Sequence, residues 1–218
     1  MNFNKNSTAF AFCFLLIFSL NGFTQTKEQD DIPSITPVEF IELNKMNPGI
    51  FLDIRYATTN NFTGKVVYPE ARAFLVKEAA LSLDSVQKEL EKSGLSLKIF
   101  DGYRPLSVQK KFWEIMPDER YVADPRKGSR HNRGMAVDLT LVYTDGKELA
   151  MPTEYDDFSE KAHRDYMNLT DEQIKNRKIL EDVMAKHGFI PFATEWWHFD
   201  YKGWEKYKVM DVDFKDIK

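Results

Sequence analysis

Two side chains with catalytic potential stand in a run of aromatic residues near the C-terminus. The run ATEWWHFDY, residues 193–201, places Glu195 and His198 among two tryptophans, a phenylalanine and a tyrosine. Aromatic residues at this density are typical of a buried strand, where a charged group requires a partner or a metal ion. A lone histidine among aromatic residues is more often a hydrogen-bonded core residue than a ligand. This run alone therefore leaves both interpretations open.

A second segment, SRHNRGMAVD at residues 129–138, strengthens the metal interpretation. Its His131 stands in a glycine-containing loop, seven residues before Asp138. Catalytic zinc takes three protein ligands from His, Asp and Glu and keeps a fourth position open. His131, Asp138 and His198 would form such a set, although their spacing alone is a moderate signal. Glu195 would then be the base that takes a proton from water and returns it to a leaving amine.

The other two histidines have structural explanations. His187 falls in the last turn of a predicted helix, where a cation interacts favourably with the helix dipole, and His163 lies in the charged run SEKAHRDY. Neither is needed as a ligand.

Hydrophobic periodicity predicts the elements that must position these residues. Strands are predicted over residues 50–57, 95–101 and 135–141, and a long loop precedes the third. Helices are predicted between residues 74 and 93, over residues 106–116, and from a capping box of Thr170 and Gln173 to about His187. We expect a final strand that contains His198, with Glu195 in a turn or bulge just before that strand. Both tryptophans are interpreted as scaffold.

The first 24 residues are typical of a secretory signal peptide. They contain one cation, Lys5, then an apolar run over residues 9–20, then the small residues Gly22 and Thr24. An uncleaved membrane anchor is the alternative, but the run is shorter than the ~18 residues expected of a spanning helix. We therefore expect an exported protein, periplasmic or released, without stable membrane association. Residues 25–46 are interpreted as a lead-in and residues 47–218 as one domain.

Composition narrows the chemistry. The chain has 218 residues, 43% of them hydrophobic, which is enough for one domain with a sizeable core. A net charge of −4 does not attract nucleic acid or anionic lipid. The one cysteine, Cys13, lies in the predicted signal peptide, so the mature protein would have no thiolate nucleophile, thiolate metal site or disulfide. The sequence does not indicate an oligomeric state.

Five blocks, in this order, closely resemble the zinc D-alanyl-D-alanine dipeptidases of the VanX type. That family belongs to a wider group of zinc D,D-peptidases that includes D,D-carboxypeptidases and the Hedgehog signalling domain. The resemblance runs from about residue 51 to residue 201 and rests on DIRYATTNNFTG, IFDGYRP, SRHNRGMAVDLTL, MPTEYDDFSEKAH and EWWHF.

The resemblance implies roles for particular residues. It makes His131, Asp138 and His198 the ligands of one zinc ion and Glu195 the general base. It makes Arg104 the cation that stabilises the oxyanion, a role suited to a guanidinium that stays charged. Further substrate contacts follow: Ser129 at the dipeptide carboxylate, Asp156 (with Asp157 as the alternative) at its free amine, and Tyr56 and Tyr68 as pocket residues.

The expected fold is an α+β domain, a mostly antiparallel sheet with flanking helices. The expected reaction is zinc-dependent hydrolysis of the free dipeptide D-Ala-D-Ala outside the cytoplasm. One alternative is a D,D-carboxypeptidase or endopeptidase acting on wall peptides, and Asp156 argues against it by closing the amino end of the site. The other is a zinc-bearing binding module without catalysis, which the presence of Glu195 and Arg104 makes less favourable.

Overall fold

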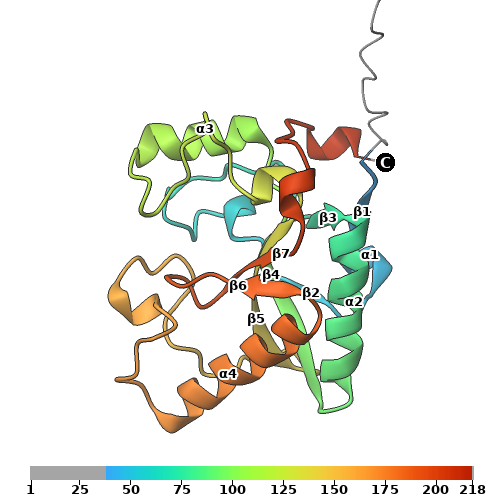
Figure 1. Cartoon of the computed structure of the whole chain (residues 1–218), viewed down its shortest axis with the longest axis vertical. Helices are drawn as coiled ribbons and strands as arrows, with labels where there is room; N and C mark the ends of the chain where they lie inside the picture. The colour runs from blue at the N-terminus through green and yellow to red at the C-terminus, as the bar shows by residue number, and fades with distance from the viewer. Residues whose placement is uncertain (1–37, 218) are drawn as a thin grey trace, which may run out of the picture. The chain divides into compact units, whose positions relative to one another are not determined.

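The computed structural model describes residues 38–217 (Figure 1). The predicted signal peptide and most of the lead-in lie outside these residues. In chain order the elements are β1 (Phe40–Glu42), α1 (Leu43–Met46), β2 (Phe51–Leu52), β3 (Phe74–Val76), α2 (Lys77–Glu91), β4 (Leu95–Asp101), α3 (Leu106–Ile115), β5 (Ala136–Tyr143), α4 (Asp171–Lys186), β6 (Phe189–Pro191) and β7 (His198–Tyr201). Short 3-10 helices lie at Arg55–Ala57, His131–Arg133, Glu160–Ala162, Trp204–Lys206 and Phe214–Asp216.

A five-stranded sheet in the order β2-β4-β5-β7-β6 forms the centre of the domain. Only β2 and β4 pair in parallel, and the other neighbours are antiparallel. A separate two-stranded antiparallel sheet joins β1 to β3. The predicted α+β class with a mostly antiparallel sheet is therefore confirmed.

Two long helices cover the sheet. α2 packs on β3 and β4, α4 packs on β5 and β6, and the two helices contact each other. The buried face of α2 is the predicted stripe, which includes Ala79, Leu83, Val86 and Leu90. Figure 1 shows α3 apart from these helices, next to the loops that lead toward β5.

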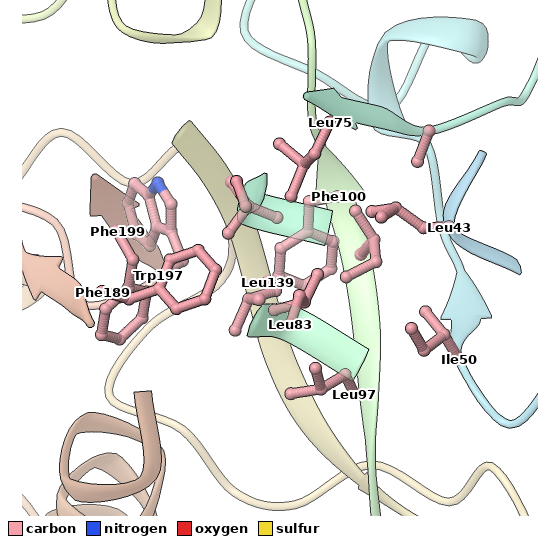
Figure 2. Close-up of a cluster of buried hydrophobic side chains, with 14 of the residues drawn as sticks. Leu43, Ile50, Leu75, Leu83, Leu97, Phe100, Leu139, Phe189, Trp197 and Phe199 are labelled. Atoms are coloured by element: carbon pink, nitrogen blue, oxygen red, sulfur yellow. The ribbon is translucent and has the colours of Figure 1, made fainter. Parts of the chain in front are cut away.

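The apolar core lies between the helices and the sheet and extends to the aromatic residues around the start of β7. Leu97, Leu139 and Phe199 lie on three neighbouring strands and are fully buried. Figure 2 shows Trp197 beside Phe189 and Phe199 at one end of this core. Because aromatic side chains are large and rigid, they form a fixed wall behind the start of β7.

Two predicted elements differ from the structure. Leu75 lies in β3 opposite Ile41 of β1, so α2 begins at Lys77 rather than near residue 74. The predicted strand over residues 50–57 pairs only through Phe51 and Leu52 and then turns into the 3-10 helix Arg55–Ala57. In the first place pairing with a distant strand overrides the local helical pattern, and in the second the lack of a strand partner beyond Leu52 ends the strand.

The predicted capping box at the start of α4 is confirmed. The hydroxyl of Thr170 accepts from the backbone N–H of Gln173, and the Gln173 side chain accepts from the backbone N–H of Thr170.

We expect Thr170→Ala to lower the free energy of unfolding by about 1 kcal/mol, because the first turn of α4 loses a cap. Urea denaturation would measure this, with Thr144→Ala as a control at an exposed turn; equal stability of wild type and Thr170→Ala would contradict it.

Candidate metal centre and active site

The three predicted metal ligands come together beside the paired strands β5 and β7. Asp138 on β5 lies directly opposite His198 on β7 in the register of the two strands. Residues directly opposite each other in antiparallel strands project to the same face. His131 joins them from the 3-10 helix His131–Arg133, which ends at Gly134 just before β5.

Three ligand atoms converge on one point. Nδ1 of His198 lies 2.9 Å from Oδ1 of Asp138. Nε2 of His131 lies 3.2 Å from Nδ1 of His198 and 3.4 Å from Oδ1 of Asp138. All three residues form a group that could hold a metal ion, with ligand atoms within 4.8 Å of one another. The predicted His-Asp-His metal site is therefore confirmed.

Hydrogen bonds on one nitrogen of each histidine ring leave the other nitrogen available to a metal ion. Nδ1 of His131 donates to the carbonyl oxygen of Gly102 at 2.8 Å, and Nε2 of His198 lies 2.9 Å from Oδ1 of Asp200. With both rings neutral, Nε2 of His131 and Nδ1 of His198 have lone pairs directed at each other. A cation between these lone pairs and the Asp138 carboxylate removes their repulsion, so the donor set fits a metal ion.

Two glycines allow the backbone to approach this closely. A Cβ on Gly102 would lie 2.7 Å from the carbonyl oxygen of Phe74, so only glycine brings the Gly102 carbonyl to His131. Gly134 has a φ of +66°, a conformation that side chains other than glycine rarely adopt.

Glu195 lies before β7, in the position predicted for it. Its Oε2 is 3.8 Å from Nδ1 of His198, and its side chain is 20% exposed. Burial raises the pKa of Glu195 above its ordinary value, although His198 beside it acts to lower that pKa. A carboxylate with a raised pKa next to a metal site is suited to general-base catalysis.

Arg104 lies in the same cavity and is held by a buried network. Its Nε and Nη2 donate to Oδ2 of Asp101 at 3.0 and 2.7 Å, and its Nη1 donates to Gln109 at 2.9 Å. Burial lowers the pKa of Arg104, but Asp101 and three neighbouring tyrosines together raise it above its ordinary value, so the guanidinium stays charged. It also packs on the Phe112 ring, 4.7 Å from the centroid.

A cavity of about 150 Å³ contains most of the predicted site. This volume is below the ~300–1,000 Å³ of many small-molecule pockets, which favours a small substrate. The lining includes all three metal ligands together with Glu195, Arg104, Ser129, Tyr56 and Asp156.

Asp156 has an unusual backbone that directs its side chain inward. Its φ is +62°, the one positive value at a residue other than glycine among residues 38–217. Its Oδ1 accepts from the Tyr56 hydroxyl at 3.1 Å and its Oδ2 from the Phe62 N–H at 3.2 Å. Burial raises the pKa of Asp156 to about 7, against the lowering effect of these hydrogen bonds. Strained backbone of this kind is often found at binding sites.

The neighbouring Asp157 has a different environment. Its Oδ1 accepts from the backbone N–H of Ser159 at 2.8 Å in an exposed turn. The structure thus separates two adjacent aspartates that the sequence leaves as alternatives, and only Asp156 lines the cavity of the metal site.

Tyr68 does not line this cavity. Its hydroxyl donates to Oδ1 of Asp101 at 2.7 Å. Because Asp101 in turn holds Arg104, Tyr68 supports the site from behind. The tryptophans also differ from each other: both are 1% exposed, but Trp197 lines the cavity as well as the core.

Sequence reasoning missed three residues that hold the site in place. Asp101 orients Arg104, Asp200 contacts His198, and Tyr155 donates from its hydroxyl to Oδ2 of Asp138 at 2.9 Å. Each stands beside or close to a residue that the motifs identified, in IFDGYRP, EWWHFDY and MPTEYDDF. Proximity to a motif was the available signal, but their contacts depend on the fold.

An α+β domain with a His-Asp-His metal site and an adjacent carboxylate defines a metallopeptidase. The family model for peptidase M15, described as D-ala-D-ala dipeptidase, matches residues 36–216. The chain therefore belongs to the peptidase M15 family.

Sequence relatives agree with this assignment. The D-alanyl-D-alanine dipeptidase of Escherichia coli (strain K12) is 35% identical over 176 residues, which cover 81% of this chain and 91% of that protein. The enzyme of the same name from Enterococcus faecalis (strain ATCC 700802 / V583) is 32% identical over 198 residues, covering 81% and 94%. Among solved structures, VanYB in complex with D-alanine-D-alanine is 16% identical with a TM-score of 0.43, covering 82% of this chain and 85% of that one.

Proposed function

We propose that the protein hydrolyses the free dipeptide D-Ala-D-Ala with one zinc ion. The observation that carries this proposal is the small cavity in which a His-Asp-His site, Glu195, Arg104 and the inward-facing Asp156 lie together. The dipeptidase relatives, which align over most of their length, support the same substrate.

The donor set favours zinc. Two imidazole nitrogens and one carboxylate oxygen are the ligands that catalytic zinc uses, with one position open for water. Zinc at such a site supplies Lewis acidity, which makes water a nucleophile near neutral pH.

Glu195 transfers the proton, and Arg104 stabilises the negative charge that develops on the carbonyl oxygen. Glu195 accepts a proton from the attacking water and returns it to the nitrogen of the peptide bond as that bond breaks. Arg104 uses two guanidinium N–H groups for Asp101 and one for Gln109, so two others can donate to the oxygen that becomes negatively charged. Buried donors directed at a developing charge stabilise the transition state strongly.

Asp156 and Ser129 recognise the two ends of the dipeptide. Asp156 has its two oxygens held by neutral donors, and an ammonium group in the cavity would favour its ionised form. The hydroxyl oxygen of Ser129 accepts from the Asn132 N–H at 3.2 Å. Its proton has no acceptor in the described part of the chain and can be donated to a carboxylate.

Substrate length tests this proposal. Acetylation of the dipeptide amine removes the charge that Asp156 binds and adds bulk to a small cavity. We expect N-acetyl-D-Ala-D-Ala to be cleaved at least ~10²-fold less efficiently in kcat/KM than D-Ala-D-Ala, since a hydrogen bond to a charged group contributes about 1.5–3 kcal/mol and an unpaired Asp156 adds a further cost.

The adjacent aspartate provides a matched control. Asp156→Ala should weaken discrimination between the free and acetylated dipeptides, whereas Asp157→Ala should preserve it. Equal cleavage of the acetylated dipeptide or of a wall pentapeptide would replace the dipeptidase assignment with a D,D-carboxypeptidase.

We further propose that the protein is exported and acts on wall-derived dipeptide outside the cytoplasm. The support is the signal-like segment of residues 1–24, which lies outside the described residues. Among those that are described, no helix is long and apolar enough to cross a membrane. We expect the mature protein to begin near residue 25, which mass spectrometry of the expressed protein would establish. Recovery of the full-length chain from the cytoplasmic fraction would contradict export.

A further inference from the structure

Two tyrosine hydroxyls form a continuous path between the metal site and Asp156. The Tyr155 hydroxyl lies 2.9 Å from Oδ2 of Asp138 and 3.3 Å from the hydroxyl of Tyr56. The Tyr56 hydroxyl in turn lies 3.1 Å from Oδ1 of Asp156. Oδ1 of Asp138 faces the histidine ligands. Tyr155 therefore holds the other carboxylate oxygen, Oδ2, which does not face them.

Packing holds both hydroxyls in position. The Tyr155 ring stacks on Phe100, with centroids 4.7 Å apart, and meets the edge of Trp197 at 5.4 Å. The Tyr56 ring packs against Phe112 at 4.6 Å. Tyr155 and Tyr56 are 7% and 2% exposed, and both line the cavity of the metal site. Tyr155 also directly precedes Asp156, whose positive φ turns its carboxylate back toward Tyr56.

A count of protons shows that this path can respond to a ligand. Each hydroxyl has one proton, and with both carboxylates ionised each hydroxyl donates to its own carboxylate. No proton then lies between the two tyrosine oxygens. A cation bound at Asp156 competes for the lone pairs of that carboxylate and frees the Tyr56 proton for the Tyr155 oxygen. Tyr155, now accepting a hydrogen bond, becomes a stronger donor to Asp138, because hydrogen bonds in a chain polarise one another.

We propose that Tyr155 is a positioning residue for the metal ligand Asp138 and that, through Tyr56, it couples the metal site to Asp156. The identity of the group at Asp156, a free ammonium, rests on the proposed function; the coupling itself concerns only residues of this chain.

Zinc affinity tests whether Tyr155 positions Asp138. It is measured on the whole mature protein, without dipeptide, by competition with a chromogenic chelator. Tyr155→Phe removes one oxygen and keeps the stacked ring. We expect it to weaken zinc binding by ~10–100-fold, the effect typical of losing an outer contact to a metal ligand. The melting temperature of the metal-free protein should change little. Tyr103→Phe is the matched control, since Tyr103 is buried and its hydroxyl accepts from the Val212 N–H at 2.8 Å, away from the ligands.

A double-mutant cycle with Asp156→Asn tests the coupling. The charge of Asp156 acts on the metal through space whether residue 155 is Tyr or Phe, so the cycle cancels that effect and isolates the hydrogen-bonded path. We expect Asp156→Asn and Tyr155→Phe to be non-additive in zinc affinity by ~3-fold or more. Tyr56→Phe should remove this non-additivity while leaving the Tyr155 contact with Asp138 in place.

The outcomes separate this inference from the proposed function. Zinc affinity within ~2-fold of wild type in Tyr155→Phe, or additive effects in the cycle, would overturn it even in an active dipeptidase. Non-additivity in a protein that does not cleave D-Ala-D-Ala would support the coupling and refute only the proposed substrate.

Discussion

Removal of zinc with a chelator is expected to abolish hydrolysis of D-Ala-D-Ala, and added zinc is expected to restore it. His131, Asp138 and His198 contribute only lone pairs, and without a cation their ligand atoms, within 4.8 Å of one another, include no Lewis acid that could make water a nucleophile near neutral pH. In the metal-free protein burial opposes a charge on His198, but Asp138 and Asp200 outweigh it and raise the pKa of His198 to about 10. A proton therefore occupies the site at neutral pH, and the metal must displace it.

This proton determines how zinc affinity should change with pH. Lower pH favours the protonated site, so the apparent zinc affinity should fall as pH falls. Titration calorimetry in buffers of different ionisation enthalpy would detect the released proton. His131→Ala should weaken zinc binding more than the ~10–100-fold typical of outer contacts, whereas His187→Ala should not, because His187 pairs with Glu89 away from the site. Undiminished turnover in a verified metal-free preparation would refute the metallopeptidase mechanism.

Glu195→Gln is expected to lower kcat by at least ~10²–10⁴-fold, the usual contribution of a positioned acid or base. Glutamine preserves the size of the side chain but cannot accept the proton of water. Because Glu195 lies 3.8 Å from His198 and is not one of the three ligands, zinc binding should persist in this variant.

The measurement must therefore report kcat and zinc content together. Loss of both would indicate that Glu195 helps to hold the metal, and normal turnover would place the proton transfer on another residue. Glu172→Gln, on the exposed first turn of α4, is the matched control and should leave kcat unchanged.

The sequence by itself determined the chemical groups of the site and the regular elements that carry them. The α2 stripe, the α4 capping box and the existence of the strand that carries Asp138 depend on residues close together along the chain, so local patterns are sufficient to predict them. The alternation around Asp138 predicted a half-buried strand, whereas residues 136–142 of β5 are all buried. Glu195 was expected before the strand and His198 within it, because strict alternation along one strand would place the two side chains on opposite faces. The spacing of these residues was only a moderate signal. The roles of His131, Asp138, His198 and Glu195 followed from the resemblance of the five blocks to the zinc D,D-peptidases.

Only the tertiary structure decided how these groups meet and which neighbours hold them. The β5-β7 register places Asp138 opposite His198, and a shift of one residue would send one of them to the other face. A register shift between Ile99 and Asp101 brings Asp101 opposite Asp138, where it can hold Arg104. Such pairings join segments far apart in the chain, so no local pattern predicts them.

The substrate contacts depend on the tertiary structure most of all. Asp156 and Asp157 are adjacent and chemically identical, and a positive φ at Asp156 alone directs one carboxylate into the cavity. The resemblance implied that Tyr56 and Tyr68 are both pocket residues, but Tyr68 donates to Asp101 behind Arg104 while Tyr56 donates to Asp156. The direction of a side chain outside regular elements is set by single backbone torsions and by the groups available to it across the fold, and neither is encoded in residue type or spacing.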